Sequence, residues 1–146
     1  MTEPAPYTAP FVLEYTYKRS LGPVLSQFFT GLRDGVLLGA RTPSGRILAP
    51  PTEYDPETGQ AVESLVPIGP GGVVTGWTWC EQLPHGCPLQ APFAWALIKP
   101  DGADTAMTHV VVAPRDAMRT GMRVRCQWAE TRSGGLWDMT FAPEDT

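Results

Sequence analysis

The sequence predicts a mainly β protein of short strands and many turns, and three observations support this fold class. The chain has 146 residues, which fits one domain. It contains 15 glycines and 16 prolines, roughly twice the ordinary usage, and they interrupt nearly every window that a long helix would need. Apolar residues make up 42% and charged residues 18%, which favours a folded domain over a disordered chain.

Charge and hydropathy narrow the function classes. The formal net charge is −4, and a general binder of nucleic-acid phosphates needs a surplus of Lys and Arg. No window approaches 18 apolar residues, and residues 1–10 lack the basic and apolar regions of a secretory signal. We therefore expect a cytoplasmic protein whose three cysteines, Cys80, Cys87 and Cys126, are free thiols.

Residues 1–36 are predicted to form an N-terminal extension and a docking helix. Residues 11–17 are rich in aromatic and β-branched side chains, which indicates an extended segment. A helix signal follows, in which Ser20 can cap the N-terminus and Pro23 lies in the first turn. Gly35 stands where a left-handed residue would end this helix.

Residues 37–61 have a different character. Two turn-forming stretches, Thr42-Pro-Ser-Gly45 and Asp55-Pro-Glu-Thr-Gly59, flank a short apolar run and the pair Pro50-Pro51. This pattern predicts two tight knuckles joined by a rib. The segment is too small to hold an apolar core of its own, so we expect another part of the structure to stabilise it.

Residues 62–146 have the pattern of five strands. The first is predicted as one long strand, residues 62–79, that bends at Gly69-Pro-Gly-Gly72. The other four, with a short helical stretch at 114–118 between the third and fourth strands, are expected at 93–98, 106–112, 121–128 and 136–141. This order is that of an OB-fold barrel, and a generic β-sandwich is the alternative.

The loop after the first predicted strand contains candidate zinc ligands. Cys80, His85 and Cys87 lie within eight residues, and His109 or Cys126 would have to complete a zinc site. The paired Cys-x-x-Cys spacing of structural zinc sites is missing there, so free loop thiols are favoured.

The sequence predicts no catalytic residues. His109 lies in the middle of a predicted strand, where a packed or hydrogen-bonded histidine is expected. Asp101 and Asp104 flank Gly102, and turn formation accounts for both. No phosphate-binding loop is found, because Gly69-Pro-Gly-Gly72 lacks the lysine and the helix that should follow it.

Aromatic and basic residues leave a binding function open. OB-folds stack single-stranded bases on aromatic side chains, and five tryptophans lie on the predicted barrel strands and their ends: Trp77, Trp79, Trp95, Trp128 and Trp137. A local basic cluster, which could instead meet an anionic partner surface or the phosphates of coenzyme A, comprises Arg115, Arg119, Arg123 and Arg125. Because the chain is acidic overall, core and interface roles are favoured for the tryptophans.

The whole pattern resembles the zinc-ribbon/OB-fold proteins first catalogued as domain of unknown function 35. The resemblance runs from about Ser20 to Pro143. Its motifs are Phe28-Phe29-x-Gly-Leu-Arg33, Pro50-Pro51, Gly72-Val-Val-Thr-Gly-Trp77, Pro92-Phe-Ala-Trp-Ala-Leu-Ile98, Asp101-Gly-Ala-Asp-Thr105 and Gly121-Met-Arg-Val124. Each motif alone is a weak signal, but the set is fairly specific in this order and spacing. It implies an N-terminal helix (1–36), a rubredoxin-like ribbon (37–61) and a C-terminal OB-fold (62–146).

One departure from the family concerns its zinc. The ribbon normally carries two Cys-x-x-Cys pairs. Arg41 and Ser44 stand in the places of the first pair here, and Asp55 and Thr58 in those of the second. We therefore expect a degenerate ribbon without zinc, whose stability comes from packing.

The resemblance also implies a partner. Family members act with thiolase-superfamily proteins, and this sequence is most similar to the subgroup paired with lipid-transfer-protein-type aldolases of steroid side-chain degradation. Those aldolases cleave a β-hydroxyacyl-CoA by a retro-aldol reaction. The implied role is a non-catalytic accessory subunit, in a hetero-oligomer with two of each subunit, whose partner supplies the catalytic residues and most of the acyl-CoA binding.

Five aromatic residues are predicted to form part of the partner contact, because their region is too small to bury them internally: Phe11, Tyr15, Tyr17, Phe28 and Phe29. The alternative function is a freestanding OB-fold protein that binds acyl-CoA or single-stranded nucleic acid.

Overall fold

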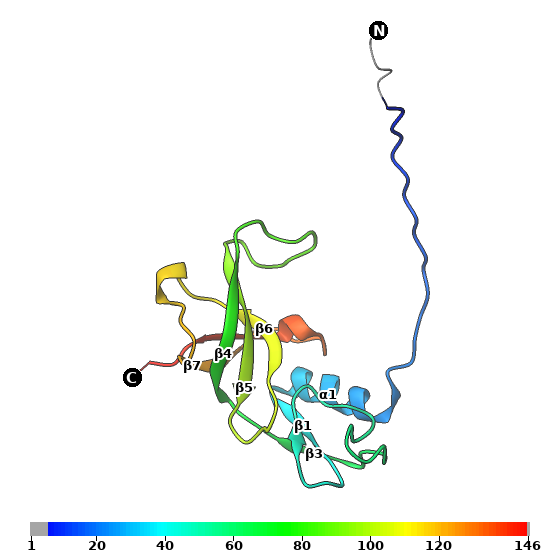
Figure 1. Ribbon diagram of the computed structural model, residues 1–146, viewed down its shortest axis with the longest axis vertical. Helices are drawn as coiled ribbons and strands as arrows, with labels where there is room; N and C mark the ends of the chain where they lie inside the picture. Colours follow the sequence, from blue (N-terminus) through cyan, green and yellow to red (C-terminus); the bar gives the residue numbers. More distant parts are fainter. Residues whose placement is uncertain (1–5, 146) are drawn as a thin grey trace.

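The computed structural model of the protein describes residues 6–145, so the first five residues of the predicted extension 1–36 lie outside the described part. Figure 1 shows the order of the elements. They are α1 (Gly22–Asp34), β1 (Leu38–Arg41), β2 (Ile47–Leu48), β3 (Ser64–Pro67), β4 (Gly71–Cys80), β5 (Phe93–Pro100), β6 (Met107–Val111), the 3₁₀-helix η1 (Arg115–Ala117), β7 (Arg123–Trp128), the 3₁₀-helix η2 (Leu136–Asp138) and β8 (Met139–Pro143).

Helix α1 confirms the predicted helix with a small shift at its start. It begins at Gly22, and Pro23 lies in the first turn as expected. Gly22 has a φ of 78°, a left-handed backbone conformation that L side chains rarely adopt, so the turn into the helix favours glycine. Gly35 has a φ of 76° and ends the helix in the left-handed conformation, as predicted.

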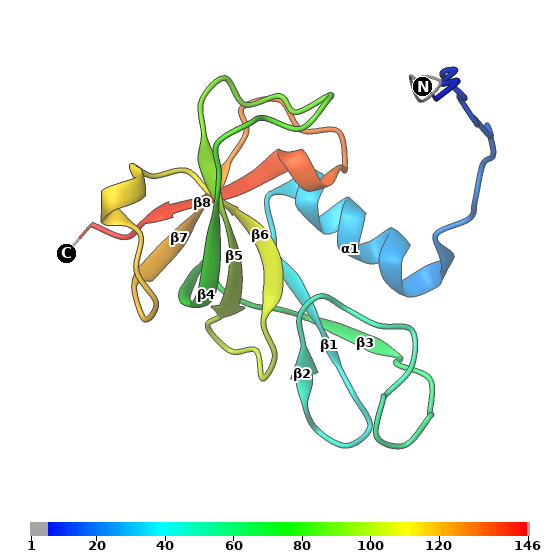
Figure 2. The ribbon, with the colours of Figure 1, turned by 45° about the horizontal axis from the view of Figure 1, so that its top comes forward.

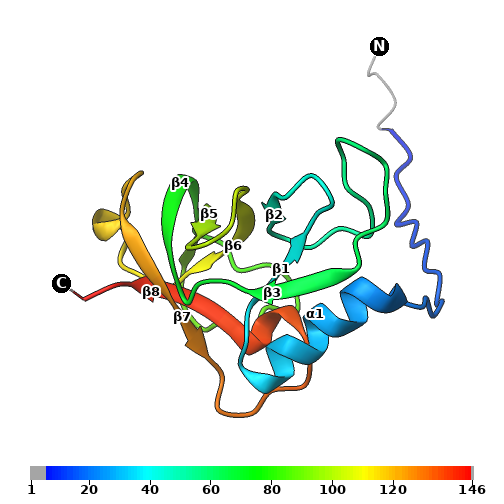
Figure 3. The same cartoon turned by 90° about the horizontal axis from the view of Figure 1, so that it is seen from below.

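A three-stranded antiparallel sheet with the order β2-β1-β3 follows the helix. Helix α1 packs on it, as Figure 3 shows. A small cluster of buried side chains joins Val24 of the helix to Ala40, Leu48 and Val62. The predicted ribbon, residues 37–61, therefore contributes to a small apolar core, but this core depends on a residue of α1.

The C-terminal half is a closed barrel with the strand order β4-β5-β6-β8-β7, which confirms the OB-fold prediction. All neighbouring strands are antiparallel except β6 and β8. The 3₁₀-helix η1 lies between β6 and β7, where the short helical stretch was predicted. The largest fully buried side chains of the barrel include Val74, Ile98, Val124, Met139 and Phe141.

The prediction of one long first barrel strand is wrong. Residues 64–67 form β3, which pairs with β1 through Val66 and Gly39. The barrel begins at Gly71, and the irregularity of its first strand lies between Val74 and Gly76. The physical reason is the intervening Gly69-Pro70: Gly69 has a φ of 72° and Pro70 has no N–H to donate, so a strand cannot continue through them.

The fifth barrel strand also starts later than predicted. Residues 136–138 form η2, and β8 begins at Met139. The carboxylate of Asp138 accepts backbone N–H bonds from Ser133, Gly134 and Gly135 at 2.6–3.1 Å. These bonds fix a turn before the strand, so the chain is not yet extended there.

The turn between β5 and β6 joins the barrel to the three-stranded sheet (Figure 2). Asp104 accepts the N–H of Ile47 at 2.7 Å and donates its own N–H to the Ile47 carbonyl at 2.7 Å. The Thr105 hydroxyl accepts the N–H of Ala49 at 2.8 Å and donates to the Ala49 carbonyl at 3.0 Å. These four bonds fill the outer edge of β2.

Candidate interaction site

The N-terminal arm, which we define as residues 6–20, leaves the start of α1 and runs away from the rest of the molecule (Figure 1). It has no regular secondary structure. Its large side chains are exposed: Phe11 by 83%, Tyr15 by 77% and Tyr17 by 80%. Three of the five predicted contact residues thus lie together on a segment that is open to another molecule.

The other two predicted contact residues lie elsewhere. Phe28 is only 2% exposed and belongs to the core between α1 and the barrel. Phe29 is partly buried, packs on that core and makes an edge-to-face contact with Phe28 at 5.3 Å between ring centroids. The premise that this region cannot bury its aromatic residues is therefore wrong for Phe28, because the barrel supplies the missing apolar surface.

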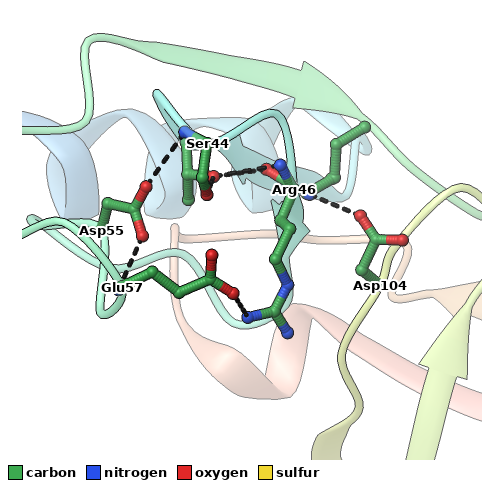
Figure 4. A network of polar contacts seen from close by, with 7 residues as sticks. Ser44, Arg46, Asp55, Glu57 and Asp104 are labelled. Carbon is green, nitrogen blue, oxygen red and sulfur yellow. Dashed lines mark hydrogen bonds and ion pairs between the residues drawn. The ribbon is translucent and has the colours of Figure 1, made fainter.

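Three of the four positions that correspond to zinc ligands, Ser44, Asp55 and Thr58, are brought together by the fold, and Figure 4 shows Ser44 beside Asp55. Asp55 is almost fully buried, with 1% exposed. Its Oδ2 accepts the backbone N–H of Ser44 at 3.1 Å, and its Oδ1 accepts that of Glu57 at 2.9 Å. The side chain of Thr58 is also near enough to lower the pKa of this carboxyl. Asp55 thus links the two knuckles, which are the turns at residues 42–45 and 55–59.

Further polar contacts surround Asp55. The hydroxyls of Thr42 and Ser44 lie 2.9 Å apart, and Arg46 pairs with Glu57 across the knuckles at 2.7 Å. Burial would raise the pKa of the Asp55 carboxyl, but the hydrogen bonds from Glu57, Ser44 and Thr58 outweigh burial and hold that pKa below its usual value. The carboxylate is therefore ionised at neutral pH.

These residues do not fit a zinc ion. Structural zinc is bound by four ligands drawn mainly from thiolates and imidazoles. The four positions supply one guanidinium (Arg41), two hydroxyls (Ser44 and Thr58) and one carboxylate. Both oxygens of the carboxylate already accept backbone N–H bonds, and Arg41 is exposed at the end of β1.

The loop cysteines are not assembled into a metal site. Among residues 6–145, no group of three or more His, Cys, Asp or Glu side chains could hold a metal ion. Cys80 and Cys87 are half-buried free thiols. Cys126 faces the core with 7% exposed, and burial raises the pKa of its thiol to about 12.

His109 is a packed core residue, as predicted. It is 5% exposed, and its Nε2 lies 2.6 Å from the carbonyl oxygen of Met139. Because a carbonyl oxygen only accepts, Nε2 carries the proton of the neutral ring. Burial lowers the pKa of His109, and the hydrogen bond to Met139 offsets this only in part.

Three of the candidate tryptophans and two of the candidate arginines are engaged within the protein itself, whereas Trp95 and Trp137 lie near each other with 6.4 Å between ring centroids. Trp77, Trp79 and Trp128 are partly buried and pack on the barrel core. Arg123 is engaged by two carboxylates, donating to Asp101 and, at 2.9 Å, to Glu144. These ion pairs raise the pKa of Arg123, and Glu144 also pairs with Arg125 at 3.5 Å, so two of the four arginines of the predicted cluster are paired with carboxylates.

Asp104 and Thr105 hold the sheet on the barrel, whereas the sequence predicts only turn formation for Asp104 and no role for Thr105. The sequence signal for this contact is the motif Asp101-Gly-Ala-Asp-Thr105. Leu13, exposed by 63% on the arm, was also missed. It alternates with Phe11 and Tyr15.

These features define a class of protein: an OB-fold barrel that carries a docked three-stranded sheet, a helix and a free aromatic arm. Comparison with known protein families narrows the class of the barrel. Residues 65–129 match the family model described as the ChsH2 C-terminal OB-fold domain. This match agrees with the family resemblance of the sequence over residues 65–129, which contain β4 to β7.

Solved structures share the fold over most of the chain. The structure of the Ltp2-ChsH2(DUF35) aldolase contains a chain with a TM-score of 0.68 and 19% identity, covering 86% of this chain and 98% of that one. A DUF35-family protein of Sulfolobus solfataricus has a TM-score of 0.64 and 22% identity, covering 84% and 87% respectively. No curated protein matches the sequence. In residues 6–145, no helix is long and apolar enough to cross a membrane.

Proposed function

We propose that the chain is the accessory subunit of a thiolase-superfamily aldolase of the lipid-transfer-protein type. The observation that carries this proposal is the fold similarity to a chain of the Ltp2-ChsH2(DUF35) aldolase, which covers 98% of that chain. The exposed arm adds a second reason, since three large aromatic side chains in water favour a partner.

The reaction proposed for the complex is the retro-aldol cleavage of a β-hydroxyacyl-CoA, with a steroid side chain as the acyl group. In this reaction the bond between Cα and Cβ breaks, the β-hydroxyl loses its proton to become a carbonyl, and Cα takes up a proton. The partner would supply the acid–base groups and most of the acyl-CoA site. This chain would stabilise the partner, in a complex with two of each subunit.

The proposal includes folding without zinc. The hydrogen bonds at Asp55 link the two knuckles in the way that a shared metal would. The cytoplasm is the proposed compartment, because the free thiols of Cys80, Cys87 and Cys126 suit a reducing environment.

Purification of the full-length chain from its native host tests the assignment. We expect a thiolase-like protein to co-purify, to be identified by mass spectrometry, and to cleave a β-hydroxyacyl-CoA faster with the chain than without it. Native mass spectrometry measures the stoichiometry. A chain that stays alone and binds acyl-CoA or an oligonucleotide tightly would support the freestanding alternative instead.

A matched pair of variants localises the contact. Tyr15→Ala removes an arm side chain that is 77% exposed, and Tyr54→Ala removes one that is 63% exposed and directly precedes the second knuckle. We expect the first to weaken the complex at least tenfold and the second to leave it unchanged. Equal effects would contradict the arm as the contact.

A further inference from the structure

We propose that residues 11–17 of the arm bind as an added β-strand on an exposed sheet edge of the catalytic partner. The inference rests on the proposed function and goes beyond it, because it states the geometry of recognition. It would make the arm a specific recognition element that becomes ordered in the complex.

The side-chain pattern of the arm is that of a half-buried strand. Phe11, Leu13, Tyr15 and Tyr17 alternate with Val12, Glu14 and Thr16 along seven residues. Successive side chains of an extended chain point to opposite sides, so one side of such a strand carries four large apolar groups. These residue types are also the ones that strands favour.

The backbone of the arm gives a second reason. Residues 11–17 take part in no ladder of the described structure. If their apolar side becomes buried, their N–H and C=O groups need partners, because unpaired buried backbone groups are costly. A sheet edge supplies an apolar surface and a row of backbone partners at once.

The described part of the chain offers no suitable edge to this strand. The edge of β2 is filled by Asp104 and Thr105. The edge strand β3 has four residues and ends at Pro67, which has no N–H to donate. In the barrel, residues 76–80 of β4 and 107–110 of β6 pair with β5 alone, but these edges are five and four residues long against seven in the arm. The folded part of a second copy of the chain has the same limits, so the acceptor edge is assigned to the partner.

Amide hydrogen exchange in the full-length complex tests the geometry. The probe is the thiolase-like protein that co-purifies with the chain. Once identified, it is co-expressed with the chain to give the complex. We expect amides 11–17 to exchange freely in the isolated chain and to be protected at every second residue in the complex. Protection of consecutive amides, or none, in an intact complex would overturn the added strand and leave the proposed function standing.

Side-chain variants give an independent readout. Leu13→Ala is expected to weaken the complex at least tenfold, and Thr16→Ala on the opposite side of the strand to leave it within twofold. Equal effects from both would overturn the inference. An arm-dependent dimer of the chain alone would also overturn it, because the occupant would then be a second copy. Failure of the full-length chain to bind any thiolase-like protein would overturn both proposals.

Discussion

The backbone N–H of Ser44 donates a hydrogen bond of 3.1 Å to the carboxylate of Asp55, eleven residues further along the chain, and this contact joins two turns. Asp55 is buried and is held at its other oxygen by Glu57. A single carboxylate therefore fixes the relative position of the two knuckles.

Asp55→Ala is expected to lower the midpoint of thermal unfolding by several degrees, because it leaves the backbone N–H groups of Ser44 and Glu57 without an acceptor. Glu57→Ala is the control, since its ion pair with Arg46 is exposed and such pairs contribute little. Circular dichroism measures both. An equal loss in the two variants would contradict the role of Asp55.

The pH dependence of Asp55 has a defined sign. Its pKa in the folded protein lies below the ordinary value of 3.8, so its contribution to stability is present above that pH and is lost as the pH falls through the folded pKa. The difference in unfolding midpoint between the wild type and Asp55→Asn should therefore shrink below about pH 4. A difference that stays constant down to pH 2 would argue against an ionised Asp55.

Metal removal should have no effect on stability. Treatment with a chelator is expected to leave the unfolding midpoint unchanged, because hydrogen bonds at Asp55 stand where the family's thiolates would be. Elemental analysis of the purified protein should give less than one zinc per ten chains. Stoichiometric zinc, or a midpoint that falls on chelation, would refute the zinc-free knuckles.

Thr105→Val should loosen the junction between the sheet and the barrel. The substitution keeps the shape of the side chain but removes both hydrogen bonds to Ala49, at an expected cost of about 1–2 kcal/mol. Faster exchange of the Ala49 amide is the specific readout. Thr108→Val, on the exposed outer side of β6, is the matched control and should leave this amide protected.

His109 should make the protein less stable in mild acid. Its pKa in the folded protein is lowered from 6.5, so the unfolded chain binds the proton first, and the free energy of unfolding falls as the pH drops below about 6.5. His109→Gln keeps an N–H donor for the Met139 carbonyl and should flatten this dependence between pH 6.5 and 5. His85→Gln, at an exposed loop position, should not.

The three thiols should differ in reactivity. Cys126 is buried beside Met139, and the pKa of its thiol is raised to about 12, so little of the reactive thiolate forms at neutral pH. We expect N-ethylmaleimide to label Cys80 and Cys87 in the native protein and Cys126 only after unfolding. Mass spectrometry counts the labels, and three labels at equal rates would contradict the buried position of Cys126.

Local signals in the sequence determined where most elements begin and end. Proline at position 23 and glycine at position 35 bound α1 because their backbone preferences act within a turn. The alternating runs in β5, β6 and β7 identified barrel strands, because the alternation of apolar and polar side chains within a strand shows which side faces the core. The aromatic arm was likewise visible in the sequence.

Tertiary structure alone decided which segments meet. Residues 64–67 read as a barrel strand, but their pairing partner is β1, and strand pairing depends on contacts far apart in the chain. The sequence predicts that Phe28 contacts a partner, but in the structure the barrel buries this side chain. Asp55 and Asp104 looked like ordinary turn residues, and only the fold shows that one joins two knuckles and the other fixes a sheet to the barrel. A residue's type limits what it can bind, whereas the path of the rest of the chain determines what comes within reach.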